Sequence, residues 1–476
     1  MRKVLWILLI LALIAPAALF AGSIDYLTNQ SARWLLSPSR NASTDAADII
    51  NYNPAGSVFL PKGLSVDLSM QTLFKFYHND NTFTPETGWK TLGTLPMGFG
   101  VNFSAKDEDE DFSQDLPTPA LPNLYVAYNF GRLGPGVLAL YFQGGVPAGG
   151  GDLEWDDGTA GTLFALNGLQ ASLASQYFSP PMGSQGANIG PLSSHSFKAS
   201  SIYYGIGLGG AYSFLDDRLS LSLGGRLVIA QRGFSIEASY GPGYKLKGEF
   251  EYNAVGFTPI IGFDVRPVQG LTLAARYEIE TRLEFEYEQK SLSGSLKAAG
   301  KSLLAQADIK DGKKFNQNLP HIIGLGAEYQ LNDDLALSVS GTFYLLSQTN
   351  LGRSNKNFFT TGYDLGFGVT YRIIENLKIG TGINYTETGA KDSYFNDSGT
   401  LLNASANPLL DSIAFGLGAT YSLKHGLDAT LSFLYSHYIP QDYSVTQYSS
   451  ANPVYSVDGT YTKDIFEIGI GIGYHY

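Results

Sequence analysis

The chain has 476 residues, a formal net charge of −12 and no cysteine, with 55 glycines, 30 tyrosines and 28 phenylalanines. The absence of cysteine excludes disulfides, thiolate metal sites and cysteine nucleophiles, and the negative charge argues against nucleic acid as a partner. This length suits several soluble domains or one large barrel, and the abundant tyrosine and phenylalanine are typical of the aromatic girdles of membrane barrels.

The first segment is predicted to be a secretory signal peptide, residues 1–21. Two basic residues precede an apolar run from Val4 to Ile14, and small residues follow up to Ala21. The alternative is a membrane-anchor helix, but Pro16 and the short apolar run favour removal. No other segment has the roughly 20 apolar residues of a spanning helix. A secreted chain that instead carries alternating strands is expected in the bacterial outer membrane, because a closed barrel leaves no backbone unpaired in lipid.

Residues 22–61 do not alternate and are predicted to form a small N-terminal hatch inside a barrel. A Ser/Thr/Asp cluster precedes a short expected helix, Ala46–Ile50. The run Asn53-Pro54-Ala55-Gly56 then forces a turn, because proline fixes φ and restricts the residue before it. The alternative is a loose periplasmic leader.

From residue 62 to the end, the pattern predicts an all-β, 14-stranded antiparallel transmembrane barrel. Short connections rich in Gly, Pro, Asn and Asp alternate with long ones, which is typical of tight periplasmic turns and long extracellular loops. The expected strands are 62–77, 120–130, 136–147, 197–214, 218–236, 248–265, 270–288, 317–331, 334–349, 358–372, 376–387, 411–423, 426–440 and 461–476.

The last strand shows the alternation most clearly. From Phe466 to Tyr476 one parity is aliphatic or aromatic, and the other carries Glu467, three glycines and His475. A half-buried strand of a soluble protein is the alternative. Within 270–288, we expect the charged parity to face the lumen, because charges in lipid cost a few kcal/mol each. These residues are Arg276, Glu278, Glu280, Arg282, Glu284, Glu286 and Glu288. They are expected either to form ion pairs that hold the hatch or to act as a substrate relay.

Two loops have leucines at helical spacing, near 160–178 and 291–306. Apolar helices at the outer rim have no core of their own, so they are expected either to line a ligand groove or to pack against each other as a lid. The candidate groove residues are Leu163, Leu166, Leu169, Leu173, Leu292, Leu296 and Leu303. Arg226, Arg276 and Lys301 are candidate cations for an acidic ligand.

Catalysis and metal binding are not expected. The sequence has no G-x-S-x-G motif, and the adjacent Ser436 and His437 face opposite ways on a strand. The acidic run Asp107–Asp111 lacks EF-hand spacing, so a solvated loop is favoured over a calcium site. We predict no enzyme activity, no cofactor and no metal site.

Three sequence pieces resemble the FadL/TodX family of outer-membrane transporters for hydrophobic compounds. They are Asn53-Pro54-Ala55 before the first strand, the paired runs starting at Leu121 and Leu138, and Leu319-Pro320 leading into Gly324-Leu325-Gly326-Ala327. The resemblance spans the mature chain and implies a hatch-plugged barrel of 14 strands that binds a hydrophobic ligand and releases it sideways at a kinked third strand.

In the resemblance, Asn53, Pro54, Ala55 and Gly56 are the hatch element at that gap, and Gly144, Gly145 and Pro147 are the kink. Glycine and proline inside a strand do indicate a bulge or a lost ladder bond. We therefore expect a monomeric protein of this family type in the outer membrane, in contact with lipid and lipopolysaccharide, that passively takes up long-chain fatty acids or similar lipophilic molecules. A general porin or a loop-mediated adhesin is the alternative.

Overall fold

The computed structural model describes residues 29–85, 109–177, 190–241, 243–306, 311–352, 355–449 and 452–476. The predicted signal peptide and Asp107 and Glu108 of the acidic run lie outside these residues. No helix among the described residues is long and apolar enough to span a membrane.

The strands form one antiparallel sheet that closes on itself, because β1 pairs with β18 from Ser65↔His475 to Pro85↔Tyr455. Twelve strands run individually round the ring, and β8 with β9 and β10 with β11 each form one interrupted strand, so the predicted count of 14 is confirmed. The ring consists of β1 (Gly63–Pro85), β3 (Thr118–Leu133), β4 (Gly136–Trp155), β5 (Leu192–Phe214), β6 (Leu219–Tyr240), β7 (Tyr244–Val268), β8 (Leu271–Glu278), β9 (Glu284–Ser293), β10 (Lys314–Asn316), β11 (Ile322–Gln330), β12 (Leu335–Tyr344), β13 (Gly362–Ile374), β14 (Leu377–Glu387), β15 (Ser412–Ser422), β16 (Leu427–Tyr438) and β18 (Asn452–His475).

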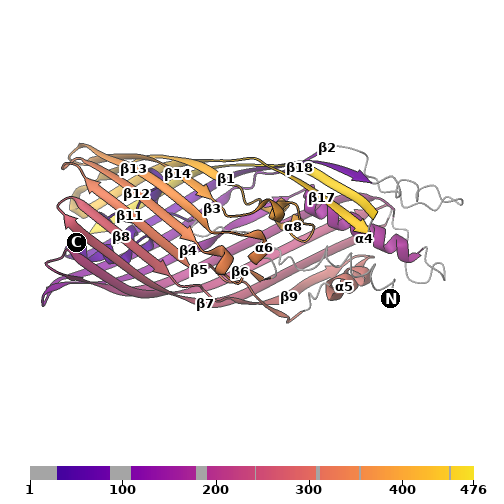
Figure 1. Cartoon of the computed structure of the whole chain (residues 1–476), viewed down its shortest axis with the longest axis horizontal. Helices are drawn as coiled ribbons and strands as arrows, with labels where there is room; N and C mark the ends of the chain where they lie inside the picture. The colour runs from indigo at the N-terminus through magenta and orange to yellow at the C-terminus, as the bar shows by residue number, and fades with distance from the viewer. Residues whose placement is uncertain are drawn as a thin grey trace.

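The outer surface carries an apolar belt of the kind that a transmembrane barrel presents to lipid. Alternate residues of the strands point outward. Five large apolar side chains among them are exposed: Leu208, Leu223, Phe415, Leu417 and Ile472. The tight turns lie together at the end that holds the C-terminus (Figure 1). Their backbones are tightly bent: Leu215, Asp216 and Asp217 have φ between 53° and 63°, in the left-handed region.

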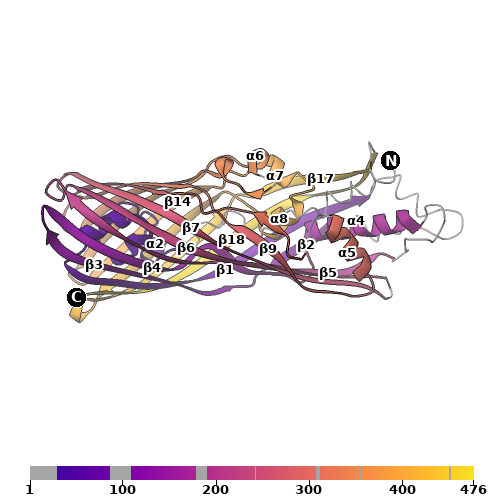
Figure 2. The same ribbon diagram turned by 90° about the horizontal axis from the view of Figure 1, so that it is seen from below.

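At the opposite end, the barrel continues as an extension whose interior is packed with side chains. The strand pairs β1–β2 and β17–β18 lengthen the wall, with β2 at Asp109–Gln114 and β17 at Gln441–Ser449. Three helices lie at this end: α4 (Ala160–Tyr177), α5 (Lys297–Gln306) and α8 (Leu401–Ala406) (Figures 1 and 2). The core of the extension is largely aromatic and includes Trp155, Phe164, Tyr252, Phe285 and Tyr455.

The expected strand 270–288 is interrupted, and its charged parity does not face the lumen throughout. Arg276 and Glu278 on β8 are buried, but beyond the break Leu283, Phe285 and Tyr287 point inward. Glu284, Glu286 and Glu288 are exposed on the outside, where they pair with Lys290 or Lys314. The prediction was wrong there because the irregular residues 279–283 shift the alternation by one position, and one such shift exchanges the two faces of a strand.

The N-terminal residues fold inside the turn end of the barrel. They contain α2 (Ala32–Leu36) and two 3₁₀ helices, η1 (Ala47–Asn51) and η2 (Pro54–Phe59). The predicted helix Ala46–Ile50 is thus a 3₁₀ turn without a side-chain cap. Lumen-facing glycines let this segment approach the wall: a Cβ at Gly469 would lie 3.0 Å from the Leu35 side chain, and one at Gly416 would meet the Leu35 carbonyl oxygen.

We expect Gly416→Leu to push the N-terminal segment away from the wall and to raise the conductance of the barrel in a planar bilayer. Overpacking a tight contact costs about 1–3 kcal/mol, and Gly416 has Pro38 as well as Leu35 against it. Gly341→Leu is the matched control, since its side chain would extend outward beside Phe343 and Leu365. A Gly416→Leu protein that conducts as little as the native protein would contradict this packing role.

Candidate functional site

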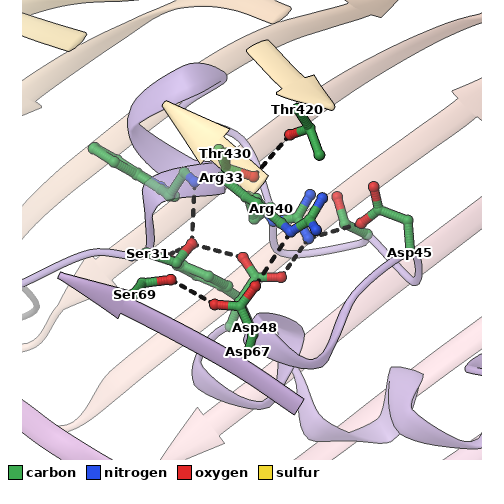
Figure 3. Close-up of polar contacts among 12 residues, drawn as sticks. Ser31, Arg33, Arg40, Asp45, Asp48, Asp67, Ser69, Thr420 and Thr430 are labelled. Atoms are coloured by element: carbon green, nitrogen blue, oxygen red, sulfur yellow. Dashed lines mark hydrogen bonds and ion pairs between the residues drawn. The ribbon is translucent and has the colours of Figure 1, made fainter. Parts of the chain in front are cut away.

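The N-terminal segment Asn29–Leu60, here called the hatch, is fastened to the barrel by buried ion pairs (Figure 3). Arg33 of α2 contacts Asp67 on β1 at 3.3 Å and Asp428 on β16 at 3.2 Å. Within the hatch, Arg40 contacts Asp48 at 2.6 Å and Asp45 at 2.7 Å. These contacts fix the internal shape of the hatch and tie it to strands from both ends of the chain.

The cations around Asp45 stabilise the ionised form of its carboxyl group. Burial by itself raises the pKa of Asp45, but the charges of Arg40 and Lys378 outweigh it and hold the pKa well below its usual range. Lys378 on β14 lies 3.1 Å from the Asp45 carboxylate. The stability contributed by the pairs of Asp45 with Arg40 and Lys378 is therefore lost only as the pH falls through the lowered pKa of Asp45.

The predicted hatch element Asn53–Gly56 lies against β6 and β7, and not at the gap beside the third strand as the resemblance implied. The Asn53 side chain caps η2 and donates to the Asp264 carboxylate at 2.7 Å and to the Phe263 carbonyl at 2.9 Å. The Ala55 carbonyl accepts from Ser220 at 2.8 Å. Pro54 is the first residue of η2, where its missing N–H costs nothing. Gly56 fits closely, because a Cβ there would lie 3.1 Å from the Ile49 side chain.

The candidate cations Arg226 and Arg276 belong to one buried charge cluster. Both guanidinium groups contact the Glu278 carboxylate, Arg226 at 2.5 Å, and all three side chains are at most 4 % exposed. Arg276 also donates to the main-chain carbonyls of Asn51 and Tyr52. Arg276 therefore contacts the hatch directly. Holding the hatch was one of the two roles expected for the charged residues of this strand, and a substrate relay was the other. Lys301 is exposed on α5.

The third barrel strand, β4, loses its partner on one side at the predicted kink. Its ladder with β3 runs only from Leu133↔Gly136 to Leu124↔Gly144. Beyond Gly144, β4 keeps β5 as its neighbour, with register shifts after Gly145 and after Ala148. Among the described residues, no strand ladder joins β4 residues 145–154 to β1, β2 or β3, and we call this boundary the seam.

Side chains, not ladder bonds, bridge the seam. The Thr118 hydroxyl donates to the Gly150 carbonyl at 2.9 Å, and the Lys75 ammonium donates to the Asp152 carbonyl at 2.5 Å. At the end of the seam nearest Gly145, the Asn123 side chain occupies the space that a Cβ on Gly145 would need. Gly145 is therefore required for the close approach of the two strands.

The hatch residues that reach the seam are Asn29, Gln30 and Asn51. The Asn29 amide donates to the Asn123 side chain at 2.9 Å, and Asn123 donates back to the Asn29 carbonyl at 3.4 Å. Both hatch asparagines line a space of about 20 Å³ together with the Gly144–Pro147 kink and Arg226. Such a space holds about one water molecule, so the hatch closes this part of the seam.

A larger cavity of about 150 Å³ lies in the lumen above the hatch. Trp34 of the hatch forms part of its floor, and Leu73, Leu410 and Ile465 contribute apolar wall. Its polar lining includes Lys75, Lys463, Asp364, Glu387 and Glu467. Gly150 also lines it, so the cavity directly adjoins the seam.

The predicted groove leucines are buried in the outer extension. Leu163 belongs to its aromatic core, and Leu166, Leu169, Leu292 and Leu296 pack together beside Tyr240 and Leu246. Helix α4 is also fastened by hydrogen bonds from Tyr240 to the Leu166 carbonyl and from Tyr455 to the Phe164 carbonyl, each 2.9 Å. These leucines thus pack as a lid in this conformation. The side chains of Leu173 and Leu303 lie outside the described residues.

Lys75 and Lys463 are two charged cavity residues that were not predicted from the sequence. Both lie on the lumen parity of their strands and are buried, at 1 % and 5 % exposure. The sequence offered one signal that could have identified them. Each is a lysine on the strand face that otherwise carries mainly small and polar residues. Because β1 and β18 are the first and last strands, only barrel closure brings the two lysines together.

The fold was compared with known proteins. No family model and no curated protein sequence matches the chain. A solved FadL homologue from Pseudomonas aeruginosa superposes with a TM-score of 0.64 at 13% identity, covering 95% of this chain and 99% of that one. The toluene transporter TodX from Pseudomonas putida gives 0.52 at 11% identity, covering 96% and 100%.

The chain has the FadL/TodX fold. The match extends over nearly the whole length of both known proteins, so the hatch and the barrel together correspond to one architecture. At this level of identity the FadL/TodX likeness defines the fold alone, and the chemistry of the lumen has to be argued from the residues of this chain.

Proposed function

We propose that this FadL-type barrel takes up hydrophobic compounds across the bacterial outer membrane. A ligand enters the lumen cavity and leaves sideways through the seam into the bilayer. One observation carries the proposal: Gly150 lies both at the seam, where no ladder to β3 is found among the described residues, and in the wall of the cavity. A ligand in the cavity therefore has a short lateral route that needs no ladder hydrogen bond to break.

The filled lumen supports this proposal over a general porin. The hatch occupies the turn end of the barrel, and the aromatic core occupies the opposite end. Both packed regions lie in the path of a polar solute through the lumen. Partition of an apolar molecule into the bilayer is favourable by itself, so the proposed transport is passive, needs no cofactor and works in a monomer.

The related structures suggest the ligand class. TodX is described as a toluene transporter and another neighbour as a FadL homologue. We extend this to the present chain as a proposal: its ligand is an aromatic hydrocarbon, a fatty acid or a similar lipophilic molecule. The hatch residues at the exit are Asn29 and Asn51, with Gly144, Gly145 and Pro147 as the kink.

The test is uptake by a Gram-negative host that lacks its own transporter for hydrophobic compounds. Cells producing the protein are expected to accumulate radiolabelled dodecanoate or toluene faster than cells with an empty vector, while uptake of a small sugar stays unchanged. Faster sugar uptake without faster uptake of either hydrophobic probe would overturn the proposal and favour the porin.

A further inference from the structure

Lys75 connects the cavity to the seam. Its side chain projects into the lumen from β1, and its ammonium donates to the main-chain carbonyls of Asp152, at 2.5 Å, and Gly150, at 3.4 Å. Those carbonyls belong to the part of β4 that lies beyond the end of its ladder with β3 at Gly144. Because a buried carbonyl without a donor is costly, Lys75 stabilises the closed position of this segment.

Lys463 completes a cationic end of the cavity. It lies opposite Tyr77 in the β1–β18 ladder, and Lys75 lies opposite Ile465, so the two lysines are diagonal neighbours on one face. Diagonal neighbours across an antiparallel pair are roughly 7–8 Å apart, a separation that one carboxylate can bridge with two long side chains. The Lys463 ammonium lies 4.6 Å from the ring centroids of both Tyr77 and Tyr438 and donates to Asn407 at 3.2 Å.

Two of the three carboxylates in the cavity are held by hydroxyl groups. Asp364 accepts hydrogen bonds from Tyr344 and Thr386, each 2.6 Å, and Glu387 accepts one from Tyr363 at 2.5 Å. Glu467 lies opposite Leu73, so it is the diagonal neighbour of Lys75 on the hatch side, as Lys463 is on the other side, and the two lysines outnumber this one carboxylate. Apolar wall from Leu410, Leu434 and Trp34 also lines the cavity. The cavity thus has a cationic end and an apolar body, which suits an anionic amphiphile.

We propose that Lys75 is a latch on the seam that the acidic head group of the ligand releases. A carboxylate bound between Lys75 and Lys463 competes with the neutral carbonyls of Gly150 and Asp152 for the Lys75 ammonium. A carboxylate adds the attraction of a full negative charge, which a neutral carbonyl lacks, so the ligand draws Lys75 away and the β4 segment loses a hydrogen bond that holds it. This inference rests on the proposed function and adds a positioning residue that couples occupancy of the cavity to opening of the seam.

The experiment compares dodecanoate with dodecanol, which has the same chain and a neutral head group. Binding to the purified full-length protein is measured by calorimetry. Seam opening is measured as the rate at which maleimide modifies Thr118→Cys, since Thr118 is buried at the seam and the chain has no other cysteine. We expect dodecanoate to bind more tightly and to accelerate modification about tenfold, whereas dodecanol does not.

Two charge-removing variants separate the roles. Lys463→Met is expected to weaken dodecanoate binding about tenfold and to leave dodecanol binding unchanged. In Lys75→Met with Thr118→Cys, modification is expected to be fast without any ligand and insensitive to dodecanoate. Lys247→Met, at an exposed pair with Glu237 that lies between β7 and β6 and away from the seam, is the matched control and should behave as the native protein.

The outcomes also separate this inference from the proposed function. If dodecanol binds as tightly as dodecanoate and accelerates modification equally, the latch is wrong while uptake of hydrophobic compounds stands. Native-rate modification of the Lys75→Met protein without ligand would likewise overturn the latch alone. If neither probe binds, both the latch and the proposed function fail.

Discussion

Deletion of Ser23–Gly56 is expected to change the protein from a nearly non-conducting barrel into a large, steady pore. The described part of this stretch fills the turn end of the lumen and contacts strands all round the wall, including β1, β7, β12 and β16. A barrel of this size has an interior wider than its own side chains fill. Single-channel conductance of the refolded protein in a planar bilayer measures the effect. Large conductance in the intact protein would contradict the hatch.

Arg40→Ala tests whether the hatch blocks conduction without deleting any part of the chain. Asp48 is fully buried and contacts Arg40 at 2.6 Å, so loss of the guanidinium leaves an uncompensated buried carboxylate. Breaking a buried pair in this way costs about 3–5 kcal/mol, and we expect frequent openings in the conductance record. Arg132→Ala, which removes an exposed pair with Asp217 at the rim, is the control and should leave the record unchanged, because exposed pairs contribute only about 0–1 kcal/mol.

A disulfide across the seam is expected to abolish uptake. A Cβ placed on Gly151 lies 3.5 Å from the Cβ of Thr118, which is at the short end of the range of about 3.5–4.5 Å that a disulfide spans. The double variant Thr118→Cys, Gly151→Cys therefore links β3 to β4 across the proposed exit. Uptake of radiolabelled dodecanoate should be lost in oxidised cells and return after reduction.

The comparison of oxidised with reduced protein is the essential control for this variant. Gly151 has φ of +78°, so a cysteine there is strained by roughly 1–2 kcal/mol in both redox states. Each single cysteine variant should be insensitive to reduction. Equal uptake by the oxidised and reduced double variants would show that the ligand does not leave between β3 and β4.

The sequence by itself determined the number of strands and which rim carries the tight turns. Both are local properties: side-chain alternation follows from the two-residue period of a strand, and the turns need residues that tolerate bent backbone. The glycines of the last strand were also recognisable as one face, and the structure places Gly469, Gly471 and Gly473 against Ala32, Arg33 and Leu35 of α2.

Tertiary structure alone decided which side chains meet. The irregular residues 279–283 exchange the faces of the seventh strand, and nothing local in the charged run reveals that shift. Arg226 and Arg276 were recognisable as lumen residues, but their shared partner Glu278 depends on packing across three strands. Lys75 and Lys463 are nearly 400 positions apart in the sequence. They become neighbours because closing the ring fixes the register of the first strand against the last, and that register is a property of the whole barrel.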